Sequence, residues 1–188
     1  DNWMSASRKG HSLIYDGSFY VSMIVSRPGG SLKSQVAEPI KVVSEIKPKE
    51  ITEPDPGIFV IDNGQNLAGW LKINLYMKKD QRLVMRFGEN LHPNGKVNQE
   101  NLRFALAQDT YISKVDGIVT WEPKFTYHGF RYVELEGLEK RPSPDNFATQ
   151  IIRSNVAKTG EFQCSDTIVN QIQSAVEWTE ISNLHGLP

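Results

Sequence analysis

The chain has little cysteine, little net charge and no long apolar run. Cys164 is the single cysteine among 188 residues, which excludes an internal disulfide and any metal site built on several cysteines. The formal net charge of -1 supplies no basic field for a phosphate backbone, so we expect no nucleic-acid partner. No apolar stretch approaches the ~20 residues that span a bilayer, so we expect no membrane partner.

Common catalytic and cofactor-binding motifs are also missing. The sequence contains no Gly-x-Ser-x-Gly nucleophile elbow, no phosphate-binding loop and no dinucleotide fingerprint. Its histidines, at positions 11, 92, 128 and 185, show no metal-ligand spacing on a helix. We therefore expect neither a cofactor nor a metal. The start, Asp1-Asn2-Trp3, lacks an initiator Met and a signal-peptide pattern, which indicates processing or an internal piece of a longer protein.

What the chain does contain is the alternation typical of β-strands. Between Leu67 and Met77 apolar residues recur at odd positions, which predicts a strand with one buried face. Residues 83–87 repeat the pattern after a polar break, and we expect the two strands to form a hairpin. Further strands are predicted at 20–25, 40–46, 57–61, 109–113, 118–122, 127–135 and 156–162. Many short strands favour a mainly β fold, an antiparallel β-sandwich or jelly roll.

The last segment predicts one C-terminal helix. Ser165 can cap it, and Asp166 in the first turn suits the positive end of the helix dipole. Apolar residues follow at helical spacing, at positions 168, 172, 175 and 176. Two proline-rich stretches, 47–57 and 139–146, are predicted to be loops.

Three residues are candidates for binding a substrate: Trp70, His128 and Arg131. Aromatic rings stack on sugar faces, and an arginine offers a fork of hydrogen-bond donors. His128 lies beside Gly129 in an aromatic stretch, where a change of phase predicts a β-bulge or a close backbone approach. The competing interpretation, packing within the sheet, is the more common one for such residues.

Carboxyl groups are the other chemistry the sequence offers. Glycoside hydrolysis needs two carboxyls on either side of a sugar. The candidates are Asp62, Glu89, Glu100, Asp109, Glu122 and Glu134. Nothing in the sequence pairs them, so no catalytic residue is assigned.

An ordered set of motifs runs along residues 57–188. It comprises 62–70 (Asp-Asn-Gly-Gln-Asn-Leu-Ala-Gly-Trp), 86–91 (Arg-Phe-Gly-Glu-Asn-Leu), 100–103 (Glu-Asn-Leu-Arg), 107–111 (Ala-Gln-Asp-Thr-Tyr), 121–134 (from Trp-Glu-Pro through His-Gly-Phe-Arg-Tyr-Val-Glu) and 160–165 (Gly-Glu-Phe-Gln-Cys-Ser). Together they resemble the concanavalin-like domain of bacterial α-L-rhamnosidases, glycoside hydrolase family seventy-eight, and the lead-in to its catalytic helical domain. Residues 15–20 resemble the tail of the preceding β domain in that family, with Ser18 in place of the usual Glu.

The resemblance implies a domain organisation and an activity. Residues 1–46 would be the tail of a preceding β domain or the first strands of the sandwich, 47–163 the concanavalin-like β-sandwich, and 164–188 the first helix of a truncated (α/α)6 catalytic domain. The parent enzyme would hydrolyse terminal α-L-rhamnosyl groups with inversion. In the family the acidic motif follows a segment that resembles 183–188, so the fragment is expected to be inactive.

The implied partners are a rhamnosylated glycan, reached through the parent enzyme, and neighbouring domains of the same chain. The compartment stays open between bacterial cytoplasm, periplasm and secretion. Two alternatives compete with the enzyme fragment. One is a carbohydrate-binding module in which Trp70 or the aromatic strand stacks on sugar. The other is a structural spacer, which predicts no sugar binding and an exposed apolar helix face between Ile168 and Val176.

Overall fold

The computed structural model describes residues 8–9, 12–13, 29–31 and 33–186, which fall into two units. The first unit, Asp1–Ser34, contributes one short antiparallel pair, β1 (Arg8–Lys9) and β2 (Ser12–Leu13). The second unit, Gln35–Pro188, carries the main sheet and the helix. The strand predicted at 20–25 lies outside the described residues.

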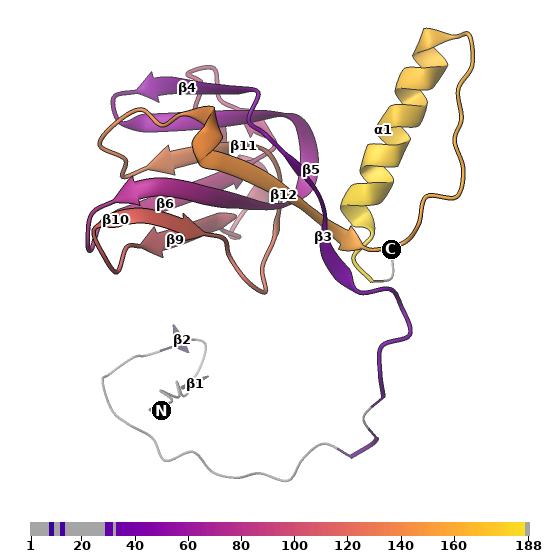
Figure 1. Ribbon diagram of the computed structural model, residues 1–188, viewed down its shortest axis with the longest axis horizontal. Helices are drawn as coiled ribbons and strands as arrows, with labels where there is room; N and C mark the ends of the chain where they lie inside the picture. The colour runs from indigo at the N-terminus through magenta and orange to yellow at the C-terminus, as the bar shows by residue number, and fades with distance from the viewer. Residues whose placement is uncertain (1–7, 10–11, 14–28, 32, 187–188) are drawn as a thin grey trace. The chain divides into compact units, whose positions relative to one another are not determined.

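Eight strands of the second unit form one antiparallel sheet (Figure 1). They are β3 (Ile40–Ile46), β4 (Glu50–Asp55), β5 (Ile58–Met77), β6 (Arg82–Gly88), β9 (Gln108–Ile112), β10 (Gly117–Trp121), β11 (His128–Glu136) and β12 (Phe147–Ser154). Their order is β3-β12-β5-β11-β6-β9, and β4 and β10 also pair with β5. The short strands β7 (Asn90–Leu91) and β8 (Val97–Asn98) form a separate pair, and two 3-10 helices are η1 (Glu100–Leu102) and η2 (Pro144–Asn146).

Strand β5 joins the two halves of the sheet because it is 20 residues long and changes partners along its length. From Ile58 to Gly69 it pairs with β11, and near its start also with β4. From Gly69 to Met77 it pairs first with β12 and then with β10. The sheet therefore curls around a single core, and the predicted mainly β, antiparallel fold class with one helix is confirmed.

The core lies inside this curled sheet. The predicted alternation is confirmed on β5, where Leu67, Leu71, Ile73, Leu75 and Met77 are all buried. Each such side chain contributes about 1.5–3 kcal/mol when it leaves water, so this buried face accounts for much of the stability. The largest fully buried side chains are Phe87, Phe130, Phe147, Ile61, Leu67, Leu71, Ile73, Met77, Leu83, Met85, Leu135 and Ile151.

Several predicted connections are wrong. Strands β5 and β6 do not form a hairpin, because β11 lies between them. Residues 47–57 are not all loop, because they contain β4. Pro54 is tolerated in this strand because, in the described part of the chain, β4 pairs only with β5 and its other edge has no neighbour. Residues 156–162 form no strand, and β12 was not predicted. Alternation reports which face of a strand is buried, but it does not report which strand lies beside it.

Helix α1 (Thr167–Asn183) begins one residue later than Ser165 would place it. Asp166 is the N-cap, and its Oδ1 accepts hydrogen bonds from the backbone N–H groups of Ile168 at 2.8 Å and Val169 at 3.4 Å. The predicted apolar stripe does not face the sheet, because Trp178 and Ile181 pack against the core instead. Among the described residues, no helix combines the length and the apolar character needed to cross a membrane.

At Gly69, β5 and β12 lie too close together to admit a side chain. A Cβ at this position would overlap with the backbone carbonyl oxygen of Gln150, so only glycine fits between the strands. Gly129 differs, because a Cβ there would meet no atom within 4 Å. Of the two alternatives predicted at Gly129, the close backbone approach is wrong, whereas β11 does carry a β-bulge or irregularity, between Phe130 and Tyr132.

These two glycines give a matched test of the fold. We expect Gly69→Ala to lower the free energy of unfolding by about 1–3 kcal/mol, because the strands must separate to admit a methyl group. Gly129→Ala, in open space, should leave it unchanged or raise it slightly. Urea unfolding of both variants measures the difference, and equal stability of the two would contradict the close approach.

Candidate functional site

Trp70, on β5, contacts a carboxylate rather than open solvent. Its indole Nε1 donates a hydrogen bond to Oε2 of Glu122 at 2.9 Å. Trp70 is half-buried, and it pairs in register with Gln150 of β12. The contact joins β5 to the segment that follows β10.

His128 is the first residue of β11 and lies between a carboxylate and an aromatic ring. Its Nε2 is 3.0 Å from Oδ1 of Asp109, and the two side chains are 10% and 12% exposed. Its ring stacks on Phe87, with centroids 4.3 Å apart and planes at 17°. The other carboxylate oxygen, Oδ2 of Asp109, is buried without a hydrogen-bond partner in the described part of the chain. The pair joins β11 to β9.

Arg131 binds Asp62 through two parallel hydrogen bonds. Its Nε and Nη2 donate to Oδ1 and Oδ2 of Asp62, both at 2.8 Å, and its guanidinium lies 5.0 Å from the ring centroid of Tyr132. The hydrogen bond from Arg131 lowers the pKa of Asp62 below its ordinary value, and the backbone N–H of Gly64 adds to the effect. Arg131 therefore ties β11 to β5, as the structural interpretation of this residue expects. A substrate-binding role for Trp70, His128 and Arg131 stays a prediction.

A further candidate carboxyl group, that of Glu134, is buried and accepts two hydrogen bonds. It is 7% exposed, and it accepts hydrogen bonds from Nη1 of Arg86 at 3.1 Å and from the backbone N–H of Val97 at 3.0 Å. Arg86 also donates to Glu136 at 2.7 Å. These bonds compensate the cost of burying a charge and fasten the β7–β8 pair to the sheet.

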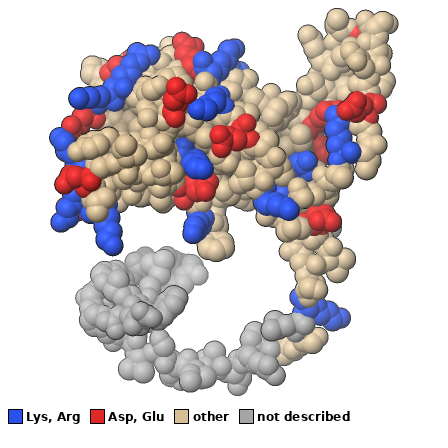
Figure 2. All heavy atoms as spheres, in the orientation of Figure 1, with Lys and Arg blue, Asp and Glu red and all other residues tan. Residues whose placement is uncertain are grey.

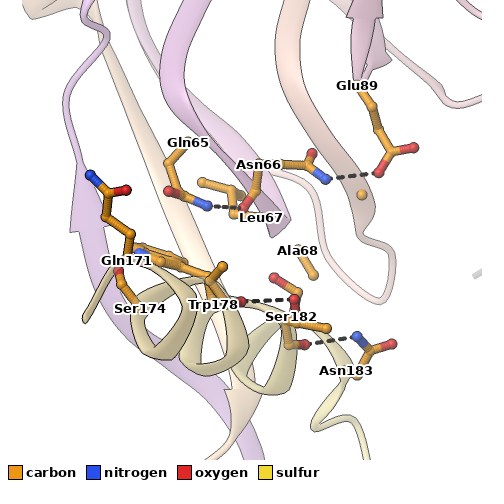
Figure 3. A pocket seen from close by; sticks show the side chains of 13 residues that line it. Gln65, Asn66, Leu67, Ala68, Glu89, Gln171, Ser174, Trp178, Ser182 and Asn183 are labelled. Carbon is orange, nitrogen blue, oxygen red and sulfur yellow. Dashed lines mark hydrogen bonds between the residues drawn. The ribbon is translucent and has the colours of Figure 1, made fainter. Parts of the chain in front are cut away.

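A pocket of about 570 Å³ opens between the sheet and helix α1 (Figure 3). The sheet side is formed by Gln65, Asn66, Leu67, Ala68, Glu89 and Gly129. The helix side is formed by Gln171, Ser174, Ala175, Trp178, Thr179, Ser182 and Asn183. None of the three predicted binding residues lies among them, although Gly129 is the neighbour of His128.

The pocket is polar and nearly neutral. Glu89 is the only charged residue in its lining, and its Oε1 accepts a hydrogen bond from Nδ2 of Asn66 at 2.8 Å. The amide of Gln65 donates to the backbone oxygen of Asn66 at 2.8 Å, and Nδ2 of Asn183 donates to the backbone oxygen of Thr179 at 2.7 Å. The remaining polar groups can serve a ligand that both donates and accepts hydrogen bonds.

Sequence reasoning missed this pocket, although it left a signal on the helix. Gln171, Ser174, Trp178 and Ser182 recur at spacings of three and four residues, so they share one helical face. That face lies beside the sheet, whereas Ile168, Ile172 and Val176 of the apolar stripe are exposed. A row of small polar residues around one tryptophan was the available sign.

Comparison with known proteins places this geometry in a family. Residues 52–153 match the family described as the bacterial alpha-L-rhamnosidase concanavalin-like domain. The chain belongs to this family. The match covers β5 to β11 and most of β4 and β12. It therefore includes nearly all of the core and the four side-chain contacts described above: Trp70–Glu122, His128–Asp109, Arg131–Asp62 and Arg86–Glu134.

Full-length relatives of the concanavalin-like domain are much longer than this chain. An alpha-L-rhamnosidase of Streptomyces avermitilis is 35% identical over 155 residues, which are 82% of this chain and 15% of that protein. One from Formosa agariphila is 32% identical over 84% of this chain and 17% of its own length. The chain thus spans less than a fifth of these relatives.

Solved structures show the same arrangement. The alpha-L-rhamnosidase from Dictyoglumus thermophilum superposes with a TM-score of 0.82 at 38% identity, over 85% of this chain and 18% of that one. The Streptomyces avermitilis enzyme, solved as a complex with L-rhamnose, superposes with a TM-score of 0.79 at 35% identity, over 82% of this chain and 15% of that one.

The motifs that resemble the rhamnosidase family are joined to one another in space. Asp62 and Trp70, in the first motif, contact Arg131 and Glu122 in the fifth motif, residues 121–134. The motif with Asp109 likewise contacts that block. Much of what identifies the rhamnosidase concanavalin-like domain is therefore a set of tertiary contacts.

The Asp62–Arg131 pair predicts that the free energy of unfolding falls at acid pH. Because the folded-state pKa of Asp62 is lowered from 3.8, its contribution is present above that value and is lost as the pH falls through the lower folded-state pKa. We expect Asp62→Asn to lower the free energy of unfolding at neutral pH by about 0.5–1 kcal/mol, since the pair is partly exposed. The deficit should shrink below pH 3.8.

Urea unfolding between neutral pH and the acid limb measures this difference. Asp80→Asn is the matched control, because Asp80 lies in an exposed turn whose left-handed backbone asparagine also adopts. A deficit for Asp62→Asn that stays constant with pH would rule out the ionised pair as its source.

Proposed function

We propose that this chain is the accessory β-sandwich portion of a longer inverting α-L-rhamnosidase, which hydrolyses terminal α-L-rhamnosyl residues of glycosides. The observation that carries the proposal is the family match over residues 52–153 in a chain that spans 15% of its Streptomyces avermitilis relative. Its partners would be a rhamnosylated glycan, through the parent enzyme, and neighbouring domains.

The contacts of the carboxyl groups support a non-catalytic role for the sandwich. Asp62, Asp109, Glu122 and Glu134 each bind a side chain of another strand or loop. A general acid or base must reach a substrate, and these four groups are occupied within the sheet. The other two candidates, Glu89 and Glu100, are exposed, and Glu89 accepts a hydrogen bond from Asn66. With four of the six candidates bound within the sheet, we infer that the catalytic pair of the parent lies outside this chain.

The same proposal divides the chain into three parts. Residues 47–163 are proposed as the concanavalin-like sandwich, and 164–188 as the first helix of the catalytic helical domain. Residues 1–46 are proposed as the tail of a preceding β domain or the first strands of the sandwich. The exposure of the α1 stripe supports this division, because Ile168, Ile172 and Val176 are 64%, 58% and 54% exposed.

Hydrolysis of an aryl α-L-rhamnoside tests the proposed activity. The 188-residue chain should release no aglycone above the buffer rate. A version extended along the reading frame past Pro188 should release it and should first produce the inverted anomer, which proton NMR detects. Activity of the short chain, or activity of the extended one only on other glycosides, would overturn the proposal.

The exposed stripe of Ile168, Ile172 and Val176 on helix α1, which the structural-spacer alternative also predicts, gives an independent test. Helix α1 carries few charges on the face shown in Figure 2, where the sheet carries acidic and basic groups side by side. We expect the isolated chain to self-associate through the exposed stripe of Ile168, Ile172 and Val176. Ile172→Glu should weaken this association by about tenfold.

Sedimentation velocity over a range of concentrations measures this effect. Tyr76→Glu is the matched control, because Tyr76 is 67% exposed on β5, pairs with Ile118 of β10 and does not line the pocket beside α1. Equal weakening by both substitutions would show that the α1 face is not the contact.

A further inference from the structure

We infer that the pocket between α1 and the sheet is a binding site for one saccharide unit of the glycan. The inference rests on the proposed function for the identity of the sugar, a terminal α-L-rhamnosyl group. It assigns to the accessory sandwich a contact with the substrate class at a pocket that Trp70, His128 and Arg131 do not line.

The shape of the pocket suits a small ligand. Its volume of about 570 Å³ falls within the range of roughly 300–1,000 Å³ typical of ligand sites. Gly129 contributes to the sheet wall, and a side chain there would extend into empty space. Its backbone is not left-handed and no strand crowds it, so the fold does not require glycine at this position. The absence of a side chain keeps the pocket open.

The chemistry of the lining suits a ring of hydroxyl groups. In the described part of the chain, the side chains of Gln171, Ser174 and Ser182 make no hydrogen bond to another protein group. Amides and hydroxyls donate and accept, as sugar hydroxyls do, so the two sets can satisfy each other. Figure 3 shows Gln65 and Asn66 across the pocket from these helix residues, which places polar groups on both sides of a bound ring.

The charge of the lining excludes other common ligands. The described residues that line the pocket include no lysine or arginine, so a phosphate or carboxylate would lack a counter-charge from them. One carboxylate, that of Glu89, provides too few oxygen ligands for a bound divalent cation. A neutral ligand remains, and Glu89 can accept two hydroxyl hydrogen bonds through the oxygen that Asn66 leaves free.

The pocket also has an apolar component. Trp178 is half-buried and packs partly against the core, while Leu67 and Ala68 contribute at the sheet side. An aromatic ring beside polar groups is the usual environment for the C–H face of a sugar. A 6-deoxy sugar adds a methyl group, which the half-buried Trp178 can shield from water, whereas Leu67 and Ala68 are only 1% and 5% exposed.

Titration followed by NMR tests the site. Methyl α-L-rhamnopyranoside added to the ¹⁵N-labelled 188-residue chain should shift the amide signals of Gly129, Asn66 and Ser182 saturably, with a Kd on the order of a millimolar for an open pocket. Gly129→Leu should weaken binding at least tenfold, and Ser174→Tyr should do the same from the helix side. Gly160→Leu is the matched control, because Gly160 is also in open space but lies outside this pocket.

The outcomes separate the site from the proposed function. Saturable shifts that both blocking variants abolish and Gly160→Leu preserves support the site, and weaker binding of D-glucose supports a rhamnosyl ligand. Absence of saturable shifts, shifts elsewhere, or binding that both blocking variants leave intact overturns the site, and equal binding of glucose overturns the rhamnosyl assignment. The proposed function is decided separately, by aryl rhamnoside hydrolysis.

Discussion

The close approach of β5 and β12 at Gly69 is the constraint on which the rest of the sandwich depends. β5 changes partners around this residue, from β11 on one side of it to β12 and β10 on the other. His128 is in register with Gly69 on β11, and Trp70 follows it on β5. The contacts of His128 with Asp109 and of Trp70 with Glu122 therefore lie on either side of the residue at which β5 changes partners. Both contacts thus flank a position that carries no side chain.

Those hydrogen bonds give the residues of the family motif a structural role, whatever they do for a substrate. A tryptophan, a histidine and an arginine near several carboxyls are the residues one would select for sugar chemistry. Here each of them satisfies a carboxylate of another segment, which is the usual requirement for polar groups that fold into a sheet. The candidate ligand pocket uses instead the neutral residues beside them, such as Gln65 and Gly129.

The sequence allowed the prediction of features that depend on local periodicity. The buried face of β5 from Leu67 to Met77 and the bounds of β3 followed from alternation. Pairing did not follow, because β11 inserts between β5 and β6 from far along the chain. Alternation did not predict β12, because its buried side chains include Thr149 and Gln150, which interrupt the apolar pattern. The pocket required the orientation of α1, which is set by tertiary packing rather than by the stripe on the helix.

The end of β12 and the end of α1 are joined, so the polypeptide leaves the sheet and returns to nearly the same point (Figure 1). The backbone N–H of Ser154 donates to the carbonyl oxygen of Leu184 at 2.6 Å, and the N–H of Gly186 donates to the Ser154 hydroxyl at 3.0 Å. Stacking of His185 on Tyr127, at 4.4 Å between centroids, adds a second attachment. Proteolytic cleavage between residues 156 and 163 would therefore leave helix α1 attached to the sheet through the contacts at its C-terminal end.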